Sequence, residues 1–127
     1  MATFDAVARL ALALPETDER LSREHRQWRV KDKLFVWERP LRKTDLAALG
    51  DAAPGGAILG ARVEHEGAKQ ALVQDPSGIY FTTPHFDGYP AILVQLDEIG
   101  LEELEEVVTE AWLCRAPPRL AAAYRER

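Results

Sequence analysis

The last quarter of the chain carries the pattern that most constrains the fold. From position 101 to position 112, apolar side chains recur at intervals of three and four residues, the spacing of one face of an α-helix. The apolar face consists of Leu101, Leu104, Val107, Val108, Ala111 and Trp112, and glutamates at positions 102, 103, 105, 106 and 110 take the other face. Pro117 and Pro118 end this helix. Because an amphipathic helix needs a second layer to cover its apolar face, the rest of the chain must supply one.

Segments rich in β-branched and aromatic residues predict the strands of that second layer. We expect a hairpin in which the strands His25–Val30 and Leu34–Glu38 flank a tight turn at residues 31–33, with Pro40 ending the second strand. Three further strands are predicted at Ala57–Val63, Ile79–Thr83 and Ala91–Leu96. Four consecutive apolar residues, 34–37, indicate that the second hairpin strand is covered on both faces.

Helical spacing also predicts a helix over residues 4–14, which Thr3 can cap and Pro15 ends. The remaining expectations are short helices at residues 44–50 and 65–74, a polar loop at 16–23, and a last turn or frayed end at 119–127. Together these elements predict an α+β fold of two layers. In it, a mostly antiparallel sheet of about five strands packs against helices that include the C-terminal amphipathic helix. No linker or repeat divides residues 1–127, so we expect a single domain.

The composition is that of an ordinary globular protein. Of 127 residues, 46% are hydrophobic and 29% are charged, which excludes a disordered chain. Cys114 is the one cysteine, so neither an intrachain disulfide nor a cysteine-based zinc site can form, and we expect a cytoplasmic protein. The first residues lack the apolar run of a signal peptide, and no segment approaches the roughly 18 apolar residues that membrane insertion requires.

Charge is distributed unevenly along the chain. The net charge is −5, which argues against general attraction to phosphate backbones. Between residues 20 and 43, however, nine lysines and arginines face three acids, whereas residues 97–110 contain seven acids and no base. Two solvated faces of opposite sign explain this pattern most simply, and a basic face that binds an anionic partner is the alternative.

No catalytic or metal-binding pattern stands out. His25, His65 and His85 do not have the spacing of metal ligands, and no glycine-rich phosphate loop is present. His85 and Asp87 could pair as a base and its orienting group, but no activated nucleophile accompanies them. Cys114, near the end of the amphipathic helix, is expected to be a buried, inert thiol. We therefore expect a protein that is not an enzyme and holds neither a metal ion nor a cofactor.

Two segments resemble a known family. Residues 28–37, Trp-Arg-Val-Lys-Asp-Lys-Leu-Phe-Val-Trp, are similar to the x-V-x-G-K-x-F hairpin of MmcQ/YjbR-like proteins. Residues 83–94, with Leu104, Ala111-Trp112 and Ala116-Pro117 downstream, resemble that family's signature TPH(F/Y)-x-GYP-x-(I/V)LV … L … AW … AP. The resemblance implies a CyaY-like or secretion-chaperone-like α+β fold and a predicted DNA-binding role through a "double wing" of hairpins. Asp32 departs from the family's usual glycine; it tolerates a left-handed conformation, but its carboxylate opposes phosphate contact.

The leading hypothesis is thus a non-enzymatic DNA-binding protein of this type. Trp28 and Trp37 are more typical of core anchors than of base-stacking platforms, so the basic residues around them carry the hypothesis. The predicted nucleic-acid-binding residues are Arg26, Arg29, Lys31, Lys33, Arg42 and Lys43 for phosphate, with His85 and Tyr89 for polar or stacking contacts. The alternatives are a protein-interaction (adaptor) or homodimeric module without nucleic-acid affinity, and a small enzyme with a deep pocket beside His85 and Asp87.

Overall fold

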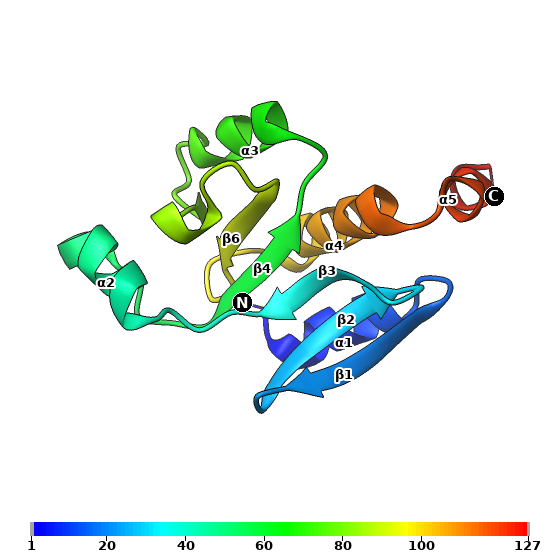
Figure 1. Ribbon diagram of the computed structural model, residues 1–127, viewed down its shortest axis with the longest axis horizontal. Coiled ribbons are helices and arrows are strands. Elements are labelled where there is room, and N and C mark those ends of the chain that lie inside the picture. Colours follow the sequence, from blue (N-terminus) through cyan, green and yellow to red (C-terminus); the bar gives the residue numbers. More distant parts are fainter. Residues whose placement is uncertain (1, 127) are drawn as a thin grey trace.

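The computed structural model describes residues 2–126, and these form a six-stranded sheet with helices on and around it (Figure 1). The strands are β1 (Thr17–Ser22), β2 (His25–Val30), β3 (Lys33–Glu38), β4 (Ile58–Arg62), β5 (Tyr80–Phe81) and β6 (Ala91–Gln95). Their order is β1-β2-β3-β4-β6-β5, and every neighbouring pair is antiparallel. The predicted α+β fold with an antiparallel sheet is confirmed, but the sheet has one strand more than expected.

The additional strand is β1, in the segment that we expected to be a polar loop. It pairs with β2 along its whole length, from Thr17 opposite Val30 to Ser22 opposite His25. Most of its residues are charged or polar, so the segment lacks the alternation of apolar and polar residues by which a strand is recognised in a sequence. Those charges suit its place at the sheet edge, where they discourage pairing with another chain.

Tight turns join the first three strands. Lys31 and Asp32 both have positive φ, 49° and 69°, as a two-residue type I′ hairpin requires. The expectation that Asp32 tolerates a left-handed backbone is confirmed. Arg23 and Glu24, with φ of 52° and 69°, form the matching turn between β1 and β2.

The helices agree with prediction except at the C-terminal end. They are α1 (Phe4–Leu12), α2 (Lys43–Leu49), α3 (Glu66–Val73), α4 (Leu101–Arg115) and α5 (Pro118–Arg125), with 3-10 turns η1 (Gly50–Ala52) and η2 (Pro84–Phe86). Thr3 caps α1 as predicted, because its hydroxyl accepts from the Ala6 N–H at 3.1 Å. Residues 118–125 form a regular helix instead of one turn, whereas Arg127 lies outside the described residues. No helix within residues 2–126 is both long and apolar enough to cross a membrane.

The main core lies between one face of the sheet and the helices α1 and α4, which Figure 1 shows behind the strands. Trp28 and Trp112 are fully buried there. Each indole N–H is satisfied: Trp28 donates to Glu19 Oε1 at 2.9 Å, and Trp112 donates to the Pro15 carbonyl at 3.1 Å. The amphipathic stripe of α4 and the expected anchoring role of Trp28 are therefore confirmed.

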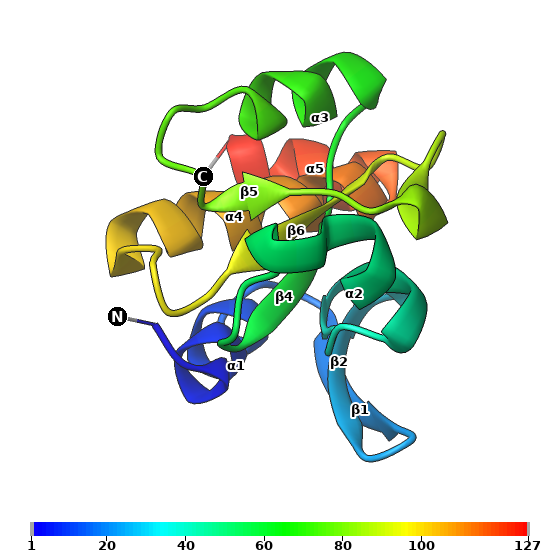
Figure 2. The ribbon, with the colours of Figure 1, turned by 90° about the vertical axis from the view of Figure 1, so that its left-hand side faces the viewer.

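The opposite face of the sheet has a smaller apolar cluster, formed by Trp37, Ile58, Phe86, Ala91 and Leu93. Both faces of β3 are covered, as its apolar run predicted. Trp37 lies directly over Gly60, where an added Cβ would come within 2.3 Å of the indole ring. The cluster has no member on β1 or β2. Figure 2 shows these two strands and the turn between them projecting away from the rest of the molecule.

Candidate nucleic-acid interface

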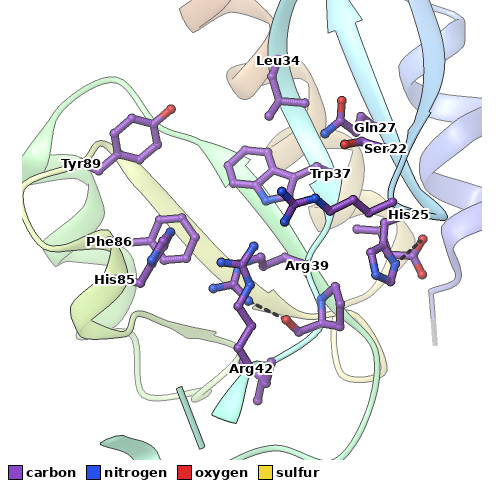
Figure 3. Close-up of a pocket in the computed structure, with 14 residues that line it drawn as sticks. Ser22, His25, Gln27, Leu34, Trp37, Arg39, Arg42, His85, Phe86 and Tyr89 are labelled. Atoms are coloured by element: carbon purple, nitrogen blue, oxygen red, sulfur yellow. Dashed lines mark hydrogen bonds and ion pairs between the residues drawn. The ribbon is translucent and has the colours of Figure 1, made fainter. Parts of the chain in front are cut away.

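A pocket of about 710 Å³ opens beside the smaller cluster (Figure 3). Three segments surround it: the β1–β2 turn, residues 37–42 at the end of β3, and the η2 loop that carries His85, Phe86 and Tyr89. Its inner wall is apolar, since Trp37 and Phe86 are both buried. The sheet and the loop must hold their positions for this pocket to exist.

A buried lysine fixes the loop. Lys69, on α3, is only 1% exposed, and its ammonium donates to the carbonyl of Phe86 at 2.6 Å and to that of Tyr89 at 3.0 Å. Glu66, at 3.9 Å, is the carboxylate nearest to it. Burying a cation is unfavourable unless it finds such partners, so Lys69 ties the loop to α3. Lys69 precedes the half-buried Leu72 and Val73 by three and four residues, so the three side chains share one face of α3. This helical spacing is the sequence signal that could have predicted the burial of Lys69.

A buried ion pair stabilises the segment on the other side of the pocket. Arg39 is 4% exposed, and its Nη1 lies 3.0 Å from Asp45 Oδ2 and also donates to the Pro40 carbonyl. The Arg39 guanidinium lies over the Phe86 ring, 5.2 Å from its centroid. Asp45 also accepts the backbone N–H of Arg42 at 2.9 Å.

The pKa of Asp45 reflects these contacts. Burial acts to raise it, but the Arg42 N–H, the Thr83 hydroxyl and the charge of Arg39 outweigh burial. The pKa of the Asp45 carboxyl therefore lies below its ordinary value, and the group stays ionised beside Arg39.

Arginines predominate among the charged residues around the pocket. Arg23, Arg39 and Arg42 line it, against one acid, Glu38. Glu38 accepts the backbone N–H of Arg26 at 3.0 Å and lies 3.8 Å from His25 Nδ1. Arg23 and Arg42 have no ion-pair partner among residues 2–126, so their charges are available to an anionic ligand.

Two rings stand at the pocket rim, where a ligand can reach them. Tyr89 is 43% exposed, and Arg62 lies over its ring at 4.7 Å and donates to its hydroxyl at 3.1 Å. His85 is also exposed and packs edge-on against Phe86, with centroids 4.8 Å apart. Both rings of the loop therefore pack against a neighbouring side chain.

The structure gathers some of the predicted phosphate-binding residues here and separates others. Arg42, His85 and Tyr89 line the pocket, and Arg29 adjoins it by donating to the side chain of Gln27, which also lines it. Lys33 and Lys43 are exposed and lie outside the pocket lining.

Arg26 and Lys31 hold other partners. Arg26 bonds Glu19 and Asp5 on the α1 side of the sheet, and Lys31 pairs with Glu16 at 3.1 Å. A phosphate-binding role for these two residues stays a prediction. Arg23, His25 and Arg39 are pocket residues that we did not predict, because sequence alone showed them only as members of a basic segment.

Both hairpin tips carry a carboxylate. Glu24 is exposed in the β1–β2 turn, and Asp32 is exposed in the β2–β3 turn. The Arg20 guanidinium bonds Asp32 and holds the pKa of that carboxyl below its usual value. Arg20 offsets the charge of Asp32, and the expected opposition between Asp32 and phosphate stays a prediction.

The groups considered for catalysis or metal binding do not assemble. Asp87 is absent from the pocket lining, and no hydrogen bond joins it to His85 within residues 2–126. His65 instead caps α3 by accepting the Ala68 N–H at 3.0 Å. The described part of the chain contains no group of three or more histidine, cysteine or acidic side chains placed to hold a metal ion. Cys114 is half-buried and not buried as expected, and this burial raises the pKa of its thiol; the inertness of the thiol stays a prediction.

A second pocket, of about 830 Å³, lies on the other face of the sheet between α3 and α4. Its acids are Asp75, Glu102, Glu103, Glu106 and Glu110, and Arg62 is its only cation among the described residues. Tyr80 donates to Glu103 there, and burial raises the pKa of the phenol above its ordinary value. This acidic pocket is therefore the electrostatic opposite of the first.

Comparison with known proteins adds the family to this geometry. A family model described as YjbR matches residues 12–114. The chain belongs to the YjbR family. Uncharacterized proteins of Mycobacterium tuberculosis and Mycobacterium bovis are 54% identical to this YjbR protein over 127 residues, which span 98% of this chain and 96% of theirs.

A solved structure supports the YjbR fold. The crystal structure of Deinococcus radiodurans protein DR2400, a DUF419 domain, superposes with a TM-score of 0.65 at 19% identity, covering 89% of this chain and 78% of that one. At that identity the likeness concerns the fold alone. The family model over residues 12–114 confirms the family resemblance seen in residues 28–37 and 83–94.

Proposed function

We propose that this YjbR protein binds single-stranded nucleic acid, without catalysing a reaction, in the basic pocket. One observation carries the proposal: the pocket places unpaired arginines and exposed rings together, with a single acid among its lining residues. A positively charged groove bordered by rings is the usual design for sequence-tolerant binding of single strands.

The arginines would contact the backbone of the strand. Arg23 and Arg42 come from different segments, and neither has an ion-pair partner within residues 2–126. A guanidinium binds phosphate through two parallel N–H donors, so each of these arginines can bind a phosphate without a second side chain. Arg29 lies on the adjoining β2, opposite the pocket residue Leu34, and extends the positive surface.

The rings would contact the bases. Tyr89 and His85 are exposed at the rim. The hydrogen bonds that Lys69 donates to their loop, and the stacking of Arg62 on Tyr89, hold the loop in place. Stacking of one base on one ring contributes roughly 1–3 kcal/mol and does not depend strongly on base identity. Since the loop is already ordered, little conformational entropy is lost on binding.

The hairpin tips favour a single strand over a duplex. A wing that enters a groove of duplex DNA must bring its tip between two phosphate backbones. Glu24 has no ion-pair partner among residues 2–126, so inserting the β1–β2 tip would set its carboxylate against like charges. Asp32, at the β2–β3 tip, is paired with Arg20. The pocket itself is concave and accepts bases that project from an unpaired strand.

Fluorescence anisotropy with a labelled oligothymidylate at low ionic strength tests the proposal. We expect saturable binding by the wild-type protein, weakened more than about tenfold by the double variant Arg23→Gln/Arg42→Gln through the loss of two charge-assisted contacts. The matched control is Arg9→Gln/Arg119→Gln, which removes the same charge from exposed positions outside the pocket lining. Absence of binding, equal weakening by both variants, or tighter binding of duplex than of single strand would contradict the proposal.

A further inference from the structure

We infer that the inner end of the basic pocket is a site for a terminal phosphate monoester, so that the protein recognises the phosphorylated end of a strand. The inference rests on the proposed function and names the part of the strand that the pocket takes. Its residues are Arg39, which is buried in the pocket wall, and Arg42, which is exposed beside it.

Arg39 has an unsatisfied donor. Its Nη1 is bonded to Asp45 and Pro40, but its Nη2 has no acceptor within residues 2–126, although it is buried. Buried polar atoms are nearly always hydrogen-bonded, and an unsatisfied one in a pocket wall indicates a partner that comes from outside. Because a guanidinium only donates, that partner must supply an acceptor.

The surroundings select an anionic acceptor. Asp45 fixes the position of both arginines. It forms an ion pair with the Arg39 side chain and accepts a hydrogen bond from the backbone N–H of Arg42. Asp45 balances the charge of Arg39, which leaves the charge of Arg42 unpaired on the same wall. Figure 3 shows the Arg39 and Arg42 side chains turned toward the rings of Phe86 and His85. An anion held here would receive donors from two guanidiniums.

The position of Arg39 favours a chain end over the middle of a strand. An internal phosphodiester has two free oxygens, and its chain leaves in two directions. A terminal monoester has three free oxygens, one ester bond and a charge near −2 at neutral pH. The Phe86 ring, the Pro40 carbonyl and Asp45 contact the Arg39 guanidinium, and Arg39 lines the pocket, so a ligand in the pocket meets it there as an end group. Because Nη2 is itself covered, the entering phosphate must displace a neighbour, and Arg42 is a long, exposed side chain on this wall.

Short oligothymidylates that differ only at their ends test the inference. One has a 5′-phosphate, one a 3′-phosphate and one hydroxyls at both ends. We expect one of the two phosphorylated forms to bind about tenfold more tightly than the hydroxyl form, the effect of one charge-assisted hydrogen bond to a buried donor. The phosphorylated form that gains affinity identifies whether the site binds the 5′ end or the 3′ end of the strand.

A length control separates the end group from total charge. A hydroxyl-ended oligonucleotide two residues longer adds two phosphodiester charges, similar to the charge of one monoester. We expect it to gain less than the phosphorylated strand. Arg39→Lys and Arg42→Gln should each reduce the affinity ratio between phosphorylated and hydroxyl forms toward one. Arg42→Gln, at an exposed position, keeps the test valid if the buried substitution unfolds the chain.

The outcomes are distinct. If hydroxyl-ended strands bind in the pocket but the end phosphate adds nothing, or no more than the longer strand gains, the inference is wrong and the proposed function stands. If no strand binds, both are wrong.

Discussion

Two pockets of similar volume lie on opposite faces of the sheet, about 710 Å³ and 830 Å³, and their charges are opposite. The basic pocket has one acid among its lining residues, and the acidic pocket has one cation. They also differ in construction. The buried Arg39–Asp45 pair lies behind the wall of the basic pocket, which also borders the loop that Lys69 holds, whereas the carboxylates of Glu102, Glu106 and Glu110 are exposed along α4.

This difference shows why net charge is a poor guide to function here. A chain of charge −5 still presents unpaired arginines, because its acids neutralise cations elsewhere. Arg20, Arg26 and Lys31, which lie on the β1–β2–β3 hairpins, each have a carboxylate partner. Arg23 and Arg42 have none among the described residues. What matters is which cations remain unpaired, and only the folded chain determines that.

The largest expected effect comes from the buried pair of the basic pocket. Asp45→Asn leaves the Arg39 charge buried without its counterion, and we expect a loss of about 3 kcal/mol in the free energy of unfolding. Urea denaturation measures it. Asp51→Asn, at an exposed position on η1, is the control and should cost little. Equal effects of the two substitutions would show that the pair is not structural.

The same variant makes a prediction about pH. Folding lowers the pKa of Asp45, so its contribution to stability is present above the unfolded-state pKa of about 3.9 and is lost as pH falls through the folded-state pKa. The stability difference between wild type and Asp45→Asn should therefore be constant near neutral pH and shrink in acid. A difference that grows below pH 4 would contradict this assignment.

Lys69→Met tests the loop clamp. The substitution keeps the side-chain volume but leaves the carbonyls of Phe86 and Tyr89 without their donor, which should cost about 2 kcal/mol. Amide hydrogen exchange should also quicken in residues 84–89 while the α1–α4 core stays protected. Gln70→Met, one position further on the exposed side of α3, is the control. Unchanged exchange in the loop would mean that Lys69 does not hold it.

The smallest effect is expected in the acidic pocket. Glu102→Gln/Glu106→Gln makes the chain two charges less negative at exposed positions on the far face of the sheet. Because exposed charges more than a Debye length of about 8 Å away are largely screened, oligothymidylate affinity at physiological ionic strength should rise less than about twofold. A large rise, measured by anisotropy, would mean that overall charge and not the basic pocket governs binding.

Much of this fold was predictable, because periodicity reports burial. The α4 stripe, the Leu34–Trp37 run and the anchoring role of Trp28 follow from patterns that depend on near neighbours in sequence. β1 was missed because its residues are chosen for an exposed sheet edge and not for a core.

The pocket was less predictable than the fold, because long-range contacts create it. Nothing near Arg39 in the sequence shows that Phe86 and Asp45 will enclose it, or that its Nη2 will lack an acceptor. Lys69 contacts carbonyls 17 and 20 residues away. The hairpin cations looked equivalent in sequence, and the acids that neutralise Arg26 lie on β1 and α1.

The salt dependence of single-strand binding tests the central claim most directly. Each phosphate neutralised by the protein adds about 0.7 to the slope of log affinity against log salt concentration. The double variant Arg23→Gln/Arg42→Gln should therefore lower the magnitude of that slope by about 1.4 relative to wild type. Arg9→Gln/Arg119→Gln should leave it unchanged. Equal slopes for wild type and the pocket variant would show that the strand's phosphates do not bind in the basic pocket.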